Sequence, residues 1–128
     1  MVLDSSAVIA VVFREEPHEK LEESIAEANS LAIGAPTLFE TEMVALGVLE
    51  YRGQELVERF LLEQGVRVVP FDAFHWPLAI KAFLRYGKGR HPAGLNYGDC
   101  MTYAIARAAG KPLLFIGDDF AQTDIAPA

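Results

Sequence analysis

The chain alternates between short apolar runs and longer stretches in which apolar residues recur at helical spacing. Short apolar runs bounded by Gly, Pro or Asp are typical of buried strands, and a spacing of three to four residues is typical of helices that face a core. Strands separated by helices indicate a parallel sheet, so the pattern predicts an α/β fold with helices on both faces of the sheet. The expected strands cover residues 2–3, 31–33, 66–69 and 113–116, and the expected helices cover residues 5–13, a segment starting at Pro17, and residues 36–51, 54–64, 72–86 and 97–109.

Local signals predict the inner faces of two of these helices and one helix boundary. In the helix that starts at Pro17, Leu21 and Ile25 have the spacing of a buried stripe on an otherwise polar helix. Gly53 is expected to separate the helix over residues 36–51 from the next one, because glycine is a weak helix former. We expect the buried side of the helix over residues 36–51 to carry Leu38, Met43, Leu46 and Leu49.

Length and composition restrict the class of protein. A chain of 128 residues has the usual size of one domain, so we expect a single domain over residues 1–128, and a hydrophobic content of 52% excludes a disordered chain. Cys100 is the only cysteine and cannot form an internal disulfide. The apolar stretch 7–13 is too short to cross a bilayer and follows Asp4 rather than a cationic segment. We therefore expect a cytoplasmic protein without membrane association.

Charge is distributed unevenly along the chain. The formal net charge of −7 argues against a nucleic-acid partner, because affinity for polyanions comes largely from Lys and Arg. However, residues 81–111 hold six of the eleven basic residues and one acid, Asp99, so this segment carries +5 and the rest of the chain −12. The expected helices before it form an acidic outer face. Within the segment, Arg85, Lys88 and Arg90 either solubilise a loop or contact a phosphate backbone.

Four acidic residues are expected to meet at one edge of the sheet. Asp4 follows the first strand, Glu40 and Asp99 lie in the first turns of helices, and Asp118 follows the last strand. In a parallel α/β sheet the carboxyl ends of the strands and the N-termini of the helices share one edge, where ligands bind. The fold, rather than any local motif, therefore brings these carboxylates together.

Each acid also has a purely local interpretation. Asp4 is suited to cap a helix, Thr37 with Glu40 matches a capping box, and Asn96 with Asp99 is a looser version of it. These roles alone would suit a metal-independent α/β protein-interaction module whose acids only cap helices. Capping does not explain why several carboxylates should share one edge, since they repel each other and raise each other's pKa unless a cation neutralises them.

The chemistry of the cluster favours a hard divalent cation. Oxygen ligands without clustered His or Cys select Mg²⁺ or Mn²⁺ over zinc, and the three histidines of the chain have no ligand spacing. Carboxylate-held Mg²⁺ usually has a phosphate as its further partner. The sequence thus predicts metal-assisted hydrolysis of a phosphate ester.

Four segments carry a resemblance to a known family. They are residues 4–7 (DSSA), 35–40 (APTLFE), 95–100 (LNYGDC) and 113–120 (LLFIGDDF), which resemble, in order, the four acidic segments of the PIN domain. Over essentially the whole chain, the sequence is similar to VapC toxins of bacterial type II toxin–antitoxin pairs, in their VapC30-like branch. The resemblance implies a PIN-like three-layer α/β/α sandwich with a central, mainly parallel sheet.

The resemblance also implies an activity, partners and roles for individual residues. It implies a Mg²⁺-dependent endoribonuclease, with Mn²⁺ as the alternative metal, that forms a homodimer, cleaves RNA and is silenced by a VapB-type antitoxin. Gly117 stands where many members have Asp, so Asp118 is the expected fourth acid and Asp119 the alternative. The expected metal-binding and catalytic residues are Asp4, Glu40, Asp99 and Asp118, the expected supporting residues are Ser6, Asn96 and Asp119, and the expected RNA contacts are Arg85, Lys88 and Arg90.

Overall fold

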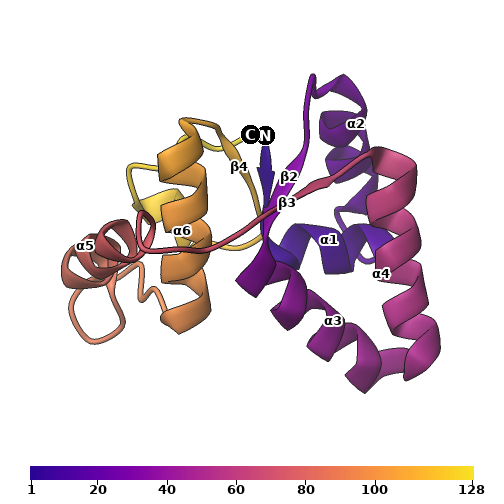
Figure 1. Cartoon of the computed structure of the whole chain (residues 1–128), viewed down its shortest axis with the longest axis horizontal. Helices are drawn as coiled ribbons and strands as arrows, with labels where there is room; N and C mark the ends of the chain where they lie inside the picture. Colours follow the sequence, from indigo (N-terminus) through magenta and orange to yellow (C-terminus); the bar gives the residue numbers. More distant parts are fainter.

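A parallel sheet lies at the centre of the molecule (Figure 1). The computed structural model describes all residues 1–128 and contains four strands in the order β3-β2-β1-β4. All three strand pairings are parallel, and Val2 pairs with Ala32 on one side and Leu113 on the other. The strands are β1 (Val2–Leu3), β2 (Ala32–Gly34), β3 (Arg67–Val69) and β4 (Leu113–Leu114).

Helices cover both faces of this sheet, which confirms the predicted three-layer α/β/α sandwich. In Figure 1, α5 and α6 lie on the left of the strands and α1 to α4 on the right. None of the helices combines the length and apolarity that crossing a bilayer requires. The helices are α1 (Ser5–Val12), α2 (His18–Glu27), α3 (Ala35–Leu49), α4 (Tyr51–Gln64), α5 (Trp76–Tyr86), α6 (Tyr97–Ala109) and the short 3₁₀ helix η1 (Phe120–Gln122).

The sheet separates two hydrophobic cores. Because neighbouring side chains of a strand point to opposite faces, Val2 packs with Ile105 and Leu113 on the α5–α6 side, whereas Leu3 packs with Ile33 on the α1–α4 side. All five side chains are at most 1% exposed. The two cores hold the strands rigidly between the helical layers, so the residues that follow each strand have fixed positions.

The boundary between α3 and α4 differs from the expected one. The chain turns at Glu50, which has a positive φ of 51°, and Gly53 lies inside α4. A Cβ at Gly53 would collide with the carbonyl oxygen of Ala45 in α3. The prediction that Gly53 separates the helices was therefore wrong, because this glycine serves the close approach of α3 and α4.

The buried face of α3 also differs from the expected one. Thr37, Thr41 and Ala45 are its buried residues, and Leu38 packs against the core as expected, while Met43 is 57% and Leu49 is 40% exposed. The threonine hydroxyls are satisfied: Thr41 Oγ1 donates to the Thr37 carbonyl oxygen at 2.7 Å, and the Thr37 hydroxyl shares a 2.7 Å hydrogen bond with that of Thr102 in α6. Small side chains allow α3 to pack closely, and several of its large apolar side chains consequently face outward.

The last strand is shorter than expected, because the chain leaves the sheet after Leu114. The backbone N–H of Ile116 donates to Ser6 Oγ at 3.0 Å instead of pairing with a neighbouring strand. Further on, the C-terminal residues return to β4, where Leu113 forms a parallel bridge with Pro127. The segment between these two points carries Asp118 and Asp119 and is anchored at Leu114 and at the buried Phe120.

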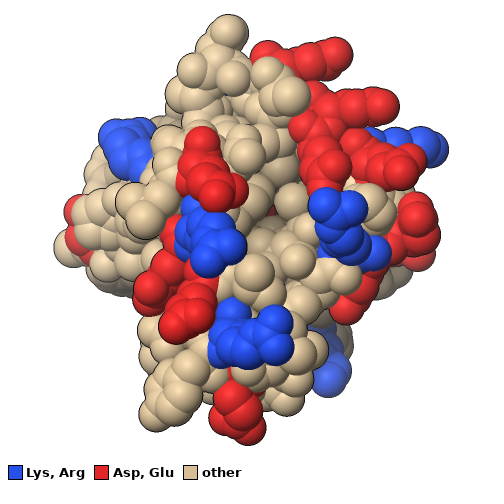
Figure 2. Space-filling view, turned by 90° about the vertical axis from the view of Figure 1, so that its right-hand side faces the viewer, with Lys and Arg blue, Asp and Glu red and all other residues tan.

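The outer surface of the α1–α4 side is acidic but not uniformly so. Figure 2 shows acidic side chains gathered toward the upper right, with Lys and Arg side chains between acidic ones elsewhere on this face. The expected acidic outer face is therefore a mixed surface with an acidic part.

Candidate active site

Asp4 follows β1 directly and caps the start of α1. Its Oδ2 accepts hydrogen bonds from the Ser6 backbone N–H at 3.1 Å and from Ser6 Oγ at 2.5 Å. The side chain is almost completely buried, with the residue 7% exposed. Burial raises the pKa of Asp4 and the nearby Glu40 charge raises it further, while the hydrogen bonds from Ser6 oppose this shift. Helix capping thus accounts for one carboxylate oxygen of Asp4. It does not account for a buried carboxyl group whose pKa is raised.

Glu40 does not form the capping box that its sequence context allows. Helix α3 starts after Gly34, with no side-chain cap, and the Thr37 hydroxyl bonds to Thr102 instead. The Glu40 carboxylate accepts from Ser5 Oγ at 2.7 Å through Oε1, and its Oε2 lies against Gly98, where a Cβ would collide with it. Glu40 therefore reaches from α3 toward the starts of α1 and α6.

Ser5 is a site residue that was missed by sequence reasoning. Its hydroxyl orients Glu40, and its neighbour Ser6 orients Asp4, so the two serines after the first strand hold two different carboxylates. The Asp4-Ser5-Ser6 run was the available signal. Nothing local in the sequence, however, assigns a hydroxyl to an acid 35 positions away.

Asn96 and Asp99 form a complete capping box at the start of α6. The Asp99 N–H donates to Asn96 Oδ1 at 2.9 Å, and the Asn96 N–H donates to Asp99 Oδ2 at 3.0 Å. The local interpretation of this pair is confirmed, but it concerns only one oxygen of Asp99. Asn96 thus fixes the side chain of Asp99 and leaves Oδ1 without a hydrogen bond from the protein.

The electrostatics show which acids lie together. The pKa of Asp99 is raised to about 6, first by burial and then by the charges of Asp4, Asp119 and Glu40. Asp118 is not among these charges, and it lies exposed on the loop after β4. The charges of Asp4 and Glu40 therefore act on Asp99, and of the two exposed acids after β4 only Asp119 does so. The identity of the fourth acid, Asp118 or Asp119, stays a prediction.

The donor set suits a hard cation in its chemistry. It offers only oxygen atoms, and none of the four acids forms an ion pair with Lys or Arg. The side chains as they lie do not converge, since no group of three is arranged to hold a metal ion. Metal binding would thus require side-chain rotation, which the exposed Glu40 and Asp119 allow.

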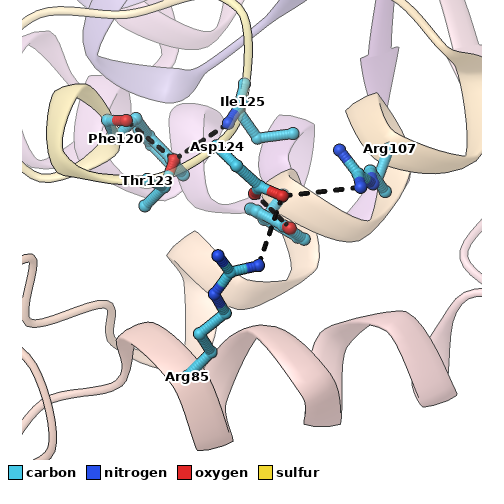
Figure 3. Close-up of polar contacts among 7 residues, drawn as sticks. Arg85, Arg107, Phe120, Thr123, Asp124 and Ile125 are labelled. Atoms are coloured by element: carbon cyan, nitrogen blue, oxygen red, sulfur yellow. Dashed lines mark hydrogen bonds and ion pairs between the residues drawn. The ribbon is translucent and has the colours of Figure 1, made fainter.

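Two of the expected RNA contacts have partners within the protein. Arg85 lies 3.5 Å from Asp124, which also pairs with Arg107 at 3.4 Å (Figure 3). Arg90 stacks over the ring of Phe83 at 5.6 Å from its centroid. Lys88 has no side-chain partner within the protein. Contacts of these residues with RNA stay a prediction.

Cys100 follows Asp99 but is unsuited to be a nucleophile. The side chain is buried, and burial together with the Asp99 charge raises the pKa of its thiol to about 11. The reactive form is the thiolate, which is scarce under these conditions. Cys100 instead packs in the hydrophobic core on the α5–α6 side of the sheet.

The family of the chain follows from its similarity to known proteins. The profile of the PIN domain matches residues 1–126, almost the entire chain. The chain therefore belongs to the PIN-domain family, as the four acidic segments indicate.

Within this family, the relatives are VapC ribonucleases. The chain is 45% identical to Ribonuclease VapC36 of Mycobacterium tuberculosis, over 98% of this chain and 91% of that protein. It is 40% identical to Ribonuclease VapC of Mycolicibacterium smegmatis, over 98% of both chains. Ribonuclease VapC30 of Mycobacterium tuberculosis is 37% identical over 98% of this chain and 96% of that protein. The resemblance to VapC toxins is thus confirmed.

Solved structures share the fold at much lower sequence identity. Mycobacterium tuberculosis VapC20, described as a sarcin–ricin loop cleaving toxin, superposes with a TM-score of 0.80 at 16% identity and covers 99% of this chain and 97% of that one. VapBC2 of Rickettsia felis, bound to a promoter DNA fragment, has a TM-score of 0.72 at 16% identity, covering 98% and 94%. At this identity the likeness supports the three-layer fold.

Proposed function

We propose that this protein is a Mg²⁺- or Mn²⁺-dependent endoribonuclease, the toxin of a VapBC-type toxin–antitoxin pair that acts in the cytoplasm. The observation that carries this proposal is that the charges of Asp4, Glu40 and Asp119 act on Asp99 at the carboxyl edge of the sheet, while none of these acids pairs with Lys or Arg. Relatives named VapC ribonucleases, at 37–45% identity, support the same activity.

The chain's own residues prepare the acids for this chemistry. Asp4 and Asp99 are the central ligands, because each has one oxygen fixed by the protein and the other free of protein hydrogen bonds. Glu40, from α3, and Asp119, from the loop after β4, complete the proposed set. A bound divalent ion would lower the pKa of the attacking water and stabilise the leaving oxygen of the phosphodiester. Ser5, Ser6 and Asn96 hold the carboxylates in place during this step.

The direct test measures cleavage of single-stranded RNA by the purified protein with Mg²⁺, with Mn²⁺ and with EDTA. We expect cleavage only with a divalent metal, and loss of cleavage in Glu40→Gln. The matched control is Glu63→Gln, an exposed glutamate on α4, which should cleave like the unchanged protein. Cleavage that persists in EDTA, or in Glu40→Gln at the full rate, would contradict the proposal.

The alternative, a metal-independent interaction module, is favoured by the real helix caps at Asp4 and Asp99. It requires each acid to act as a cap, and Glu40 does not. The two functions differ in their response to metal: a binding site stabilises the folded state, so millimolar Mn²⁺ raises Tm, whereas a module without a site shows no shift. An unchanged Tm together with absent cleavage would establish the alternative.

The partners follow from the same family and from the surface. We infer a VapB-type antitoxin and a homodimer, since similar solved structures include VapBC2 of Rickettsia felis and a Klebsiella pneumoniae toxin–antitoxin complex. Helices α3 and α5 offer exposed apolar side chains for protein partners, among them Val44, Val48, Ile80 and Leu84. Sedimentation of the isolated chain tests the dimer, and a clean monomer would contradict it.

A further inference from the structure

A pocket of about 550 Å³ adjoins the carboxylate cluster. It lies between the first turns of α3 and α6, and the Glu40 carboxylate forms part of its wall. The pocket is therefore continuous with the proposed site of phosphodiester cleavage. Its lining includes Phe39, Glu40, Met43, Phe71, Tyr97 and Gly98.

Two aromatic rings at this pocket are free to receive a ligand. Phe39 is 68% and Tyr97 is 82% exposed, and neither ring stacks on another aromatic ring of the protein. Exposure of such large rings beside a functional site is costly without a partner. Phe39 precedes Glu40 directly, and Tyr97 lies two positions before Asp99, so the helix backbone that carries each ring is fixed relative to the acids.

The charge of the lining restricts what can occupy the pocket. No Lys or Arg lines it, and Glu40 is its only charged residue. The pocket therefore offers no positive charge to attract a phosphate group, whereas an uncharged planar group can stack on the rings. In single-stranded RNA, the uncharged planar group that adjoins every phosphate is a nucleobase, and bases stack readily on aromatic side chains.

We propose that this pocket is a nucleobase subsite, in which a base next to the cleaved phosphodiester stacks on Tyr97 and Phe39. The inference rests on the proposed ribonuclease function and adds a determinant of substrate position to it. In this arrangement the carboxylates act on the phosphodiester of the RNA, and the two rings bind the neighbouring base. Single-stranded RNA should consequently be preferred over duplex, whose paired bases cannot enter the pocket.

The first test is kinetic. Tyr97→Ala should raise KM for a short single-stranded RNA by about tenfold or more, because the free energy of stacking one base on an aromatic side chain corresponds to a change in affinity of about this size. The effect on kcat should be smaller. Tyr97→Phe and Phe39→Tyr keep the rings and should keep KM, whereas Phe39→Ala should raise it. Tyr51→Ala, which removes a 77% exposed tyrosine at the start of α4, is the matched control and should behave like the unchanged protein.

The second test measures binding without cleavage, in EDTA, by fluorescence anisotropy of a labelled single-stranded RNA. An otherwise identical RNA lacking the base next to the cleaved bond should bind the unchanged protein more weakly. Tyr97→Ala should not distinguish the two RNAs, because the ring that senses the base is gone. If RNA binds in this ring-dependent way but is never cleaved with metal, the subsite stands and the ribonuclease proposal fails.

Three outcomes would overturn the subsite. Equal KM for Tyr97→Ala, Phe39→Ala and the unchanged protein, with normal cleavage, would leave the ribonuclease proposal intact and remove the base pocket. Loss of self-association in these variants at unchanged RNA affinity would assign the rings to a second copy of this chain. Loss of antitoxin binding at unchanged RNA affinity would assign them to that protein.

Discussion

Helix α6 has an acid-centred cluster at each end, and the two clusters differ in every electrostatic respect. At its start, Asp99 faces other carboxylates, and burial together with these charges raises its pKa to about 6. Toward its end, Asp124 accepts a hydrogen bond from the Tyr103 hydroxyl at 2.6 Å and pairs with Arg107 and Arg85 (Figure 3). These partners hold the pKa of Asp124 below its usual value.

The difference separates structural from functional acids. Asp124 has all its partners within the chain, and its effect is to fasten the C-terminal segment to α5 and α6. The carboxylates near Asp99 have hydroxyl and backbone donors but no cation, so folding leaves their repulsion uncompensated. An acid that the protein keeps buried and unneutralised is a better candidate for function than one with satisfied ion pairs.

The largest expected difference between the cluster around Asp99 and the cluster around Asp124 is in the rate of RNA cleavage. Asp4→Asn should lower the rate of metal-dependent RNA cleavage by about 10³-fold or more, because it removes the buried carboxylate that we propose as a metal ligand. Asp124→Asn should leave the rate unchanged. Rates are compared on the same single-stranded RNA with saturating Mn²⁺. A similar loss in both variants would mean that the distinction between the clusters is wrong.

A smaller effect identifies the fourth acid. Asp119→Asn should lower cleavage by about 10- to 100-fold, since its charge acts on Asp99, while Asp118→Asn should cleave like the unchanged protein. The two variants differ by one position in the same exposed loop, so each controls for the other. The reverse order of activities would restore the sequence-based choice of Asp118.

At the opposite end of α6, the expected effect is on stability. Asp124→Asn should lower the free energy of unfolding by about 1 kcal/mol, because it weakens two ion pairs that are largely exposed. Urea denaturation of the metal-free protein measures this change. A variant as stable as the unchanged protein would show that the C-terminal segment is held by the packing of Phe120 and Ile125 alone.

The last expected effect is on the pH dependence of the free energy of unfolding, which should have opposite signs for Asp99 and Asp124. The pKa of Asp99 is about 6 in the folded protein and about 4 in an unfolded chain, so the folded state binds this proton more tightly. Its contribution to stability is therefore complete below about pH 4 and is lost as the pH rises through about 6. We expect a fall of about 1 kcal/mol in the metal-free protein, reduced by solvent screening.

The variant Asp99→Asn isolates this effect, because it should make the fall in stability across that pH interval smaller by the contribution of Asp99. Asp124, whose pKa is lowered, stabilises the fold above its ordinary pKa of 3.8, and this contribution is lost as the pH falls below that value. Denaturation curves at several pH values measure both slopes. A stability that rises between about pH 4 and pH 7 in the presence of Asp99 and absence of metal would contradict the raised pKa.

Much of the fold was predictable from hydrophobic pattern, and so was the edge at which Asp4, Glu40 and Asp99 meet. Both follow from a general rule: when parallel strands are joined by helices, the carboxyl ends of all the strands lie at the same edge of the sheet. The bounds of α6 were also predictable, because Asn96 and Gly110 are strong end signals.

Other features depend on contacts between distant segments. Pattern alone placed Met43 in the core, yet the contacts of α3 require Thr37, Thr41 and Ala45 there. The position of Asp118 and Asp119 depends on how the chain leaves β4, where the Ile116 N–H donates to Ser6 Oγ instead of continuing the strand. No propensity of either segment by itself encodes such a bond.

The hydrogen bond from Ile116 N–H to Ser6 Oγ joins the end of the chain to its beginning, so it forms only after most of the chain has been synthesised. Strand β4, the last strand of the sheet to be synthesised, pairs with β1, the first, and the Asp4 N–H donates to the Leu114 carbonyl oxygen at 2.9 Å. Pairing two segments so far apart in the sequence requires the closure of a long loop, which has an entropic cost. A nascent chain that has not yet made β4 lacks both the support of Ser6 by Ile116 and the acids after it. The site is therefore complete only when the last strand of the sheet and the loop after it have been synthesised and have folded against β1.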